Sequence, residues 1–199
     1  SRKQQLDTLR LESLVKELEL QTIKAHINPH FIFNSLNSIR ALVDENPQRA
    51  RKAVTELSNI LRSSMQAEKM ETVTLEKELG IVKDYLALEN MRFEDRLKIE
   101  YQIDEDTLDQ PVPPMMLQTL VENAIKHNEF SESNPLLIKV SVNEHYLQVS
   151  NNIKPKLYAV NSTGIGLKNL SSRYKILFRK DITISTSHEN FIVKLPLIT

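Results

Sequence analysis

The sequence predicts an α+β fold, with an all-helical part over about residues 1–72 followed by a mixed helix-and-strand part over about 73–199. In the first part, apolar residues recur at alternating spacings of four and three. In the second part, short runs rich in β-branched residues are separated by helical patterns. With 40% hydrophobic and 26% charged residues, the composition is that of an ordinary folded protein.

Composition and charge exclude several classes of function. Lys plus Arg and Asp plus Glu both number 26, so no overall charge favours nucleic acid or a membrane surface. The absence of cysteine excludes disulfides, thiolate catalysis and zinc–thiolate sites. No apolar run approaches the roughly 20 residues that span a bilayer. Because Ser1 opens directly into a charged helical pattern, we expect the sequence to be cut from a longer chain.

Residues 6–43 are predicted to form one long helix, because a single heptad stripe runs through them. A proline inside a helix removes a hydrogen bond and costs roughly 3 kcal/mol or more. We therefore interpret Pro29 as a local weakness at which this helix bends beside His30. The stripe consists of Leu11, Val15, Leu18, Thr22, Ala25, Pro29, Ile32, Leu36, Ile39 and Val43.

A second helix is predicted over about 48–68, after a turn at Asn46-Pro47. It repeats the heptad spacing at Ala50, Val54, Leu57, Leu61 and Ser64. Two antiparallel helices cannot bury both stripes alone, so we expect the hairpins of two chains to pair into a four-helix bundle. The alternative is a monomeric hairpin that packs on the rest of the chain.

The remaining elements follow from caps and from runs of β-formers. Thr74 is a candidate cap for a helix that runs to about residue 92, with Glu76 and Glu78 favourably placed near its N-terminus. Further helices are predicted near 114–128 and 166–178. Strands are predicted at 97–103, 136–143, 146–151, 181–187 and 190–196.

The stretch INPHFIFNSLNSI (27–39) contains a candidate reactive histidine. The heptad places Pro29 in the seam, and His30, Phe31 and Asn34 outside it. His30 and Asn34 are four residues apart, so they share one outward face. An ordinary surface histidine is the alternative. His26 adds a third polar residue, but no carboxylate or cysteine completes a metal-ligand set, so a metal site is not favoured.

The stretch LQTLVENAIKHN (117–128) forms an amphipathic helix with an unusual polar face. Thr119, Asn123 and His127 lie on a face away from the apolar stripe, with Glu122 and Lys126 beside them. A neutral oxygen ligand suits hydrated Mg²⁺, and cationic groups suit phosphate. A solvated helix face is the alternative.

Two of the three glycines stand together in TGIGLKNL (163–170). Gly164 and Gly166 directly precede a predicted helix, so backbone N–H groups there can meet a phosphate at close approach. The spacing is neither that of a Walker loop nor that of a Rossmann fingerprint. A tight turn that starts the helix is the alternative.

In this order, the motifs resemble those of the LytS-like sensor histidine kinases. INPHFIFNSLNSI resembles the phosphoacceptor box, and TLEKELGIVKDYLALENMRFEDRL resembles the linker-proximal helix of the family. LQTLVENAIKHN resembles the N box, and TGIGLKNLSSRY resembles the glycine box. The resemblance covers nearly the whole chain. It implies a dimerisation and phosphotransfer hairpin (1–72) followed by a Bergerat-type α/β sandwich that binds ATP (73–199).

The resemblance also implies roles for single residues. His30 would attack the γ-phosphate of ATP and then pass the phosphoryl group to an aspartate of a response regulator, often one with a LytTR-type DNA-binding domain. Residues 153–163 would form a lid, and Glu122 is the candidate base. Asn123 would hold Mg²⁺, and the nucleotide would be bound by Asn123, Lys126, His127, Asn151, Gly164, Gly166 and Leu167.

Two positions depart from related patterns. Phe31 stands where many histidine kinases have a carboxylate, and at an outward heptad position we expect it to be an exposed docking contact. Asn151 in VSNNIKP (149–155) stands where Bergerat sites have an aspartate that accepts a hydrogen bond from adenine. As a neutral acceptor it makes a weaker bond. Because Asn152 follows, the register is open by one residue.

We expect a protein-histidine kinase that forms homodimers, binds no nucleic acid directly, and is the cytoplasmic portion of a bacterial inner-membrane protein whose membrane part would precede residue 1. Asn34 is a candidate for orienting a water in regulator dephosphorylation. One alternative is a GHKL-type ATPase, although Thr119 stands where hydrolytic members need a glutamate. The other is a catalytically weak dimeric scaffold.

Overall fold

The computed structural model describes residues 2–22, 28–67, 69–94, 96–143, 145–154 and 164–198, without the side chains of residues 2, 16–22 and 165. The chain divides into two compact units. The helical unit comprises Ser1–Lys69 and Lys83–Arg92, and the sheet unit comprises Met70–Val82 and Phe93–Thr199. The helix α4 (Leu75–Phe93) contributes residues to both units. The predicted domain boundary near residue 72 stays a prediction.

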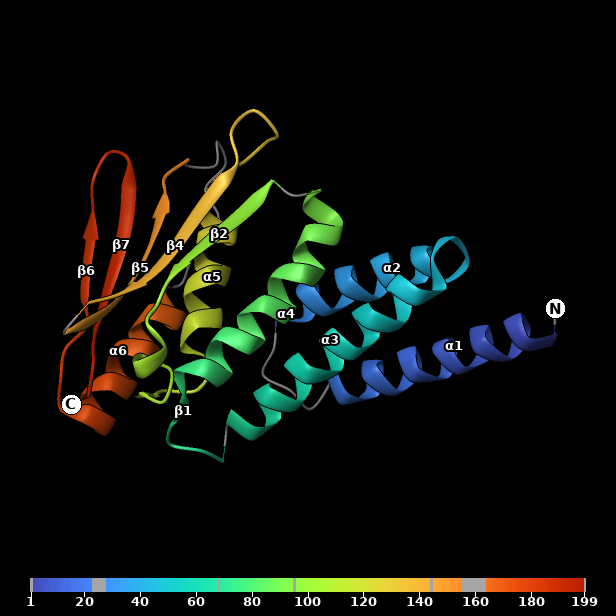
Figure 1. Cartoon of the computed structure of the whole chain (residues 1–199), viewed down its shortest axis with the longest axis horizontal. Coiled ribbons are helices and arrows are strands. Elements are labelled where there is room, and N and C mark those ends of the chain that lie inside the picture. Colours follow the sequence, from blue (N-terminus) through green and yellow to red (C-terminus); the bar gives the residue numbers. More distant parts are fainter. Residues whose placement is uncertain are drawn as a thin grey trace. The chain divides into compact units, whose positions relative to one another are not determined.

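Three helices account for most of the helical unit: α1 (Arg2–Thr22), α2 (Pro29–Glu45) and α3 (Pro47–Ala67). They lie side by side, and α1 contacts both α2 and α3 (Figure 1). Most of the described heptad positions are buried, as predicted, whereas Pro29 is exposed and Val43 is half-buried, so the predicted seam is wrong at Pro29. The buried heptad positions are Leu11, Val15, Ile32, Leu36, Ile39, Ala50, Val54, Leu57, Leu61 and Ser64.

The prediction of one continuous helix over 6–43 is wrong, because α2 begins at Pro29. Asn28 is its N-cap, and the Asn28 side-chain oxygen accepts the His30 backbone N–H at 3.1 Å. At the first helical position proline loses nothing, since the N–H there has no intrahelical partner. Pro29 therefore starts a helix and does not bend one. Residues 25–27 of the predicted bend lie outside the described residues.

The sheet unit contains five strands in the order β2-β4-β5-β7-β6, with β2 (Leu97–Gln102) parallel to β4 (Leu136–Val142) and all other pairs antiparallel. The other strands are β5 (Tyr146–Asn152), β6 (Thr183–Thr186) and β7 (Asn190–Pro196). A separate antiparallel pair, β1 (Val73–Thr74) with β3 (Pro111–Val112), and a short 3-10 helix, η1 (Glu105–Thr107), were not predicted.

Two helices, α5 (Met116–His127) and α6 (Ile165–Phe178), cover one face of this sheet (Figure 1). Alternate residues of the central strands point into the layer between sheet and helices, as period-two patterning requires. The buried residues of this core include Leu117, Leu120, Val121, Leu136, Ile138, Val140, Leu147, Val149, Leu170, Tyr174, Val193 and Leu195. The predicted α+β class is confirmed.

The helix α4 begins as its sequence predicts. The Thr74 hydroxyl accepts the Lys77 backbone N–H at 3.3 Å, which satisfies one of the free N–H groups of the first turn. Residues 83–92 of α4 pack with the helical unit, where Tyr85, Leu86 and Leu88 are buried. The side chain of Asn59 on α3 donates to Asp84 at 3.0 Å. This half of α4 gives the hairpin a further apolar partner.

Candidate functional site

His30 lies in the first turn of α2, and its side chain is exposed. The Asn34 amide nitrogen is 3.1 Å from Nδ1 and 3.4 Å from Nε2 of the same ring. An amide NH₂ can donate to whichever ring nitrogen carries no proton, so this contact can select the tautomer of the ring. The structure therefore brings the two predicted residues together on one face, with the Asn34 amide against the imidazole ring of His30.

Phe31, the neighbour of His30, was predicted to be exposed, but the structure buries it. It is only 2% exposed, and its ring lies 4.6 Å, centroid to centroid, from the ring of Tyr85 on α4. The heptad was extended from α1 across a helix break, and it took no account of α4 as a further partner. The exposed aromatic of this turn is instead Phe33, at 59%. The prediction that Phe31 is exposed is therefore wrong.

On α5, the polar face predicted from the sequence is built around Asn123. Its amide nitrogen is buried and has no hydrogen-bond partner within the described part of the chain. The Thr119 hydroxyl, one turn earlier, donates to the Met115 carbonyl at 2.7 Å. Lys126 is exposed, and His127 ends the helix. A buried, unpaired amide donor has a desolvation cost, which an anionic ligand such as phosphate would offset.

The two predicted glycines do not both precede the helix, because Gly164 is the N-cap of α6 and Gly166 is already its second residue. Gly164 adopts φ +61°, a left-handed conformation that favours glycine, and it precedes α6. At Gly166 a Cβ would lie 3.3 Å from the Thr119 methyl carbon and 3.9 Å from the Asn123 amide nitrogen. The glycine box therefore meets the N box at close range, and the half-buried Leu167 follows directly.

Asn151 and Asn152 point to opposite faces of β5. Asn151 is 6% exposed and shares its face with Leu147 and Val149, which is the face that α5 contacts. The Asn152 side chain instead accepts the Leu137 N–H at 2.8 Å and donates to the Pro135 carbonyl at 3.0 Å. Asn152 therefore holds the start of β4, and Asn151 is the residue that faces the helix layer.

Within the Asn151 side chain, the amide nitrogen donates to the Asn152 carbonyl at 2.8 Å. Its Oδ1 is then the group that can accept a hydrogen bond from a ligand. Of the predicted lid, residues 155–163 lie outside the described residues.

Glu122 lies on α5 beside Asn123. Its carboxylate accepts a hydrogen bond from the Gln118 side chain at 2.8 Å. Burial raises the pKa of Glu122, while the Gln118 hydrogen bond and the charge of Lys126 oppose the rise. A carboxylate whose pKa is raised is better suited to receive a proton near neutral pH.

Sequence reasoning missed two residues that hold this region together. Glu78 of α4 accepts the backbone N–H groups of Met115 and Leu117 with its two oxygens, at 2.8 and 2.9 Å. Asn128, 5% exposed, donates to the Ala124 carbonyl at 2.8 Å and accepts the Lys154 N–H at 2.6 Å. Both contacts join residues more than 25 positions apart, so no local pattern could have found them.

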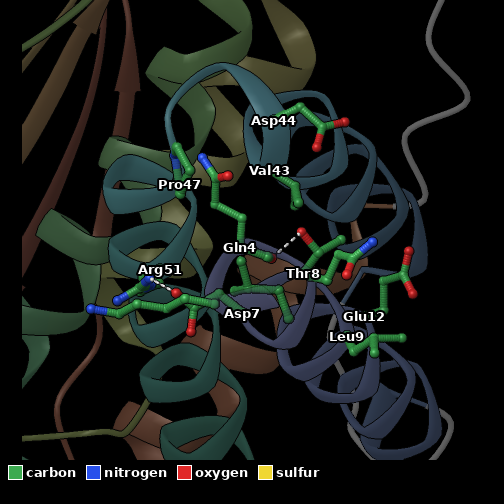
Figure 2. Close-up of a pocket in the computed structure, with 12 residues that line it drawn as sticks. Gln4, Asp7, Thr8, Leu9, Glu12, Val43, Asp44, Pro47 and Arg51 are labelled. Atoms are coloured by element: carbon green, nitrogen blue, oxygen red, sulfur yellow. Dashed lines mark hydrogen bonds and ion pairs between the residues drawn. The ribbon is translucent and has the colours of Figure 1, made fainter. Parts of the chain in front are cut away.

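The described residues also line an open pocket of about 1070 Å³ in the helical unit, between α1 and the turn that joins α2 to α3. Its walls include Asp7, Thr8, Leu11, Val43 and Arg51, and Asp7 and Arg51 form an ion pair at 3.0 Å (Figure 2). None of the predicted site residues lines it, and His30 belongs to the opposite end of α2.

The described residues contain no group of three or more histidines or carboxylates that could hold a metal ion, and His26 lies outside them. An Asn123 site for Mg²⁺ would thus depend on phosphate oxygens and water for the remaining ligands. None of the helices, in the part of the chain that is described, has the length and apolar character needed to cross a membrane.

Comparison with known proteins places these features in one family. A sequence model of the histidine kinase family matches residues 18–97. The sensor protein LytS of Staphylococcus saprophyticus subsp. saprophyticus is 35% identical over 195 residues, which cover 89% of this chain and 33% of that protein. The sensor histidine kinase/phosphatase LytS of Staphylococcus aureus strain Mu50 is 36% identical over 188 residues, which cover 86% and 32%.

The chain thus spans about a third of the length of these relatives. Among solved structures, the cytoplasmic segment of the histidine kinase QseC matches with 14% identity and a TM-score of 0.45, over 64% of this chain and 76% of that one. From its family match and its curated relatives, the chain belongs to the LytS-like family of sensor histidine kinases.

Proposed function

We propose that this chain is the kinase core of a sensor histidine kinase, which phosphorylates its own His30 with ATP and passes the phosphoryl group to an aspartate of a response regulator. The observation that carries the proposal is the approach of Gly166 to Asn123, whose buried amide lacks a partner among the described residues. Membership of the histidine kinase family and the kinase names of its relatives support the proposal.

The first chemical step is attack by an unprotonated ring nitrogen of His30 on the γ-phosphorus. An N–P bond forms, the bond between that phosphorus and the bridging oxygen breaks, and ADP leaves with the oxygen. Near pH 7 a large part of an ordinary imidazole population is neutral, so no strong base is needed. Glu122 is the proposed acceptor of the ring proton, because its raised pKa suits that role.

The nucleotide would be held by side chains and backbone of the sheet unit. Asn123 would hold Mg²⁺, which when bound neutralises charge on the phosphates. The backbone around Gly164 and Gly166 would approach the phosphates, Leu167 would frame them, and Lys126 and His127 would supply positive or hydrogen-bonding groups. Asn151 would accept from the adenine amino group through Oδ1. Because Asn151 is neutral, we propose that ATP binding is weaker than with an aspartate.

Proposed partners follow from the family. Histidine kinases of this family act as dimers and pass phosphate to a response regulator. We propose that the regulator of this chain has a LytTR-type DNA-binding domain. Leu6, Leu9 and Leu14 of α1 are 55%, 63% and 43% exposed, which favours a second copy as the dimer partner. Membrane attachment through residues before Ser1, with this chain in the cytoplasm, completes the proposal.

A second activity, dephosphorylation of the regulator, is favoured by the contact between Asn34 and His30. In this proposal the Asn34 amide orients a water for attack on the regulator's aspartyl phosphate. The Staphylococcus aureus relative carries the name kinase/phosphatase. The test measures dephosphorylation of a phosphorylated regulator. Full phosphatase activity in Asn34→Ala, or no phosphatase activity in the wild type, would contradict this proposal.

Incubation with γ-labelled ATP tests the main proposal. The kinase predicts an acid-labile label on the protein that is lost in His30→Gln and kept in His188→Gln, a change to an exposed histidine of the sheet unit. Free phosphate without labelled protein would indicate an ATPase, against which Thr119 argues because its hydroxyl is already bonded to the Met115 carbonyl. If neither labelled protein nor free phosphate forms, the chain is a catalytically silent scaffold.

A further inference from the structure

Glu78 is a buried acidic residue outside the set that binds nucleotide or receives phosphate. It lies in the first turn of α4 and is 4% exposed. Its two oxygens accept the N–H groups of Met115 and Leu117 at 2.8 and 2.9 Å. A buried carboxylate is costly unless its oxygens are satisfied, so this geometry is specific to the site.

These hydrogen bonds cap a helix that has no cap of its own. Met115, the residue before α5, adopts a left-handed conformation (φ 64°, ψ 16°) and makes no side-chain cap hydrogen bond. The first N–H groups of a helix have no intrahelical acceptor and carry partial positive charge. A carboxylate from α4 supplies both the acceptors and the opposite charge. Glu78 of α4 therefore caps the N-terminus of α5.

The capped turn leads directly to the proposed nucleotide site. The Met115 carbonyl accepts the Thr119 backbone N–H at 3.0 Å and the Thr119 hydroxyl at 2.7 Å. Asn123 follows one turn later on the same face, and Gly166 lies against both side chains. A shift or rotation of the first turn of α5 would therefore move Asn123 relative to the glycine box.

Charged and titratable groups reach Glu78 from α6, whereas the first turn of α5 (116–119) has none. Arg173 donates to the Pro114 carbonyl at 2.9 Å, and its charge favours the ionised form of Glu78. The Tyr174 hydroxyl lies 3.5 Å from the Met116 sulfur, and burial together with the charge of Glu78 raises the pKa of that tyrosine. Two side chains of α6 thus contact Pro114 and Met116, beside the residues that Glu78 caps.

We propose that Glu78 is a positioning residue for nucleotide binding, whose carboxylate holds the first turn of α5 so that Asn123 and Gly166 meet the phosphates of Mg·ATP. The inference rests on the proposed function and adds a residue to it. Two oxygens must accept from two different N–H groups, which a protonated carboxyl or a glutamine amide does poorly. Burial, the largest influence, raises the pKa of Glu78 to about 7, so protonation falls within an accessible pH range.

The test compares Glu78→Gln with Glu76→Gln, which removes the same charge from an exposed position in the same turn. The dissociation constant of Mg·ATP is measured by calorimetry at pH 6 and pH 8. We expect Glu78→Gln to bind about tenfold more weakly than Glu76→Gln at pH 8, a coupling in the ordinary range. We also expect the two variants to differ little at pH 6, where Glu78 is protonated.

Taking the difference between the two variants cancels the titration of ATP itself and of His127. A merely structural role would lower the number of binding-competent molecules without changing the affinity or its pH dependence. Equal affinities of the two variants at pH 8 would overturn the proposal. A second variant, Arg173→Gln, keeps the test valid if Glu78→Gln does not fold. Because the charge of Arg173 favours the ionised form of Glu78, its loss should move the pH midpoint of Mg·ATP affinity above that of the wild type. An unmoved midpoint would also overturn the proposal.

Amide hydrogen exchange separates this proposal from the proposed function, because it needs no nucleotide. We expect faster exchange at Met115 and Leu117 in Glu78→Gln than in Glu76→Gln. Unchanged exchange would overturn the cap. A wild-type protein that bound no Mg·ATP while showing this difference would overturn the nucleotide role of Glu78 together with the proposed function, and would leave the cap established.

Discussion

The proposed phosphoacceptor and the proposed nucleotide-binding residues differ in how they are held. His30 is exposed, begins a helix, and has Asn34 as its polar neighbour. Asn123 and Asn151 face the interior of the sheet unit, beside helices fixed by long-range hydrogen bonds such as that of Glu78. A nucleophile that serves two partners in turn benefits from exposure, whereas nucleotide binding benefits from a prearranged site.

The exposure of His30 depends on a buried neighbour, and this gives the largest expected effect. Phe31→Ala should destabilise the chain by about 3–5 kcal/mol, because it removes a buried aromatic ring that packs on Tyr85. Urea unfolding measures the loss. Phe33→Ala is the matched control and should change stability by no more than about 0.5 kcal/mol, since that ring is 59% exposed. Equal losses would contradict the burial of Phe31.

The interior position of Glu78 predicts a dependence of stability on pH. Burial raises the pKa of Glu78 from its ordinary value of 4.5 to about 7 in the folded chain. Between these values the folded state binds more protons, so the free energy of unfolding falls as the pH rises. The fall contributed by this group is at most about 3 kcal/mol between pH 5 and 8.

Glu78→Gln should remove this contribution, while Glu76→Gln should retain it. Measurement of unfolding by urea at several pH values compares the two variants, in which Glu122 titrates alike. Parallel profiles would show that Glu78 does not titrate as its burial requires. Since the ionised form is expected to bind Mg·ATP better, affinity and stability should change in opposite directions with pH.

Close packing of the glycine box on the N box predicts a sizeable effect from one methyl group. Gly166→Ala should weaken Mg·ATP binding about tenfold, because the new Cβ would lie 3.3 Å from the Thr119 methyl carbon and push α6 away. Thr119→Ser in the same chain removes that methyl and should restore most of the affinity. Gly80→Ala, with nothing within 4 Å, is the control. A double variant no better than Gly166→Ala would contradict this account.

The smallest effect is expected at the start of α2. Asn28→Ala should cost about 1 kcal/mol of stability, since the His30 backbone N–H would lose its capping oxygen. Asn37→Ala, at an exposed interior position of the same helix, should be neutral or slightly stabilising. Thermal unfolding compares the two. A neutral Asn28→Ala would mean that α2 does not begin as described.

The sequence predicted most of what depends on local periodicity. The heptad positions Leu57 and Leu61 are buried, the alternation in β4 and β5 is present, and Thr74 caps α4. The motifs also predicted that His30 and Asn34 share a face. These features depend on residues close together in the chain, and a pattern can therefore reveal them.

What the sequence did not predict depends on distant residues. Phe31 is buried because α4, some 50 positions later, supplies Tyr85 as its partner. Glu78 and Asn128 join segments that only the fold brings together. The prediction for Pro29 is wrong for a local reason, because the heptad stripe spans two helices and the cap at Asn28 separates them.

The central claim is that His30 accepts a phosphoryl group from ATP. Incubating the chain with γ-labelled ATP and Mg²⁺, then mapping the label to a peptide, tests it most directly. The account predicts an acid-labile phosphoryl group on the peptide that contains His30, absent in His30→Gln and present in His188→Gln. A label at another residue, or one that survives in His30→Gln, would contradict it.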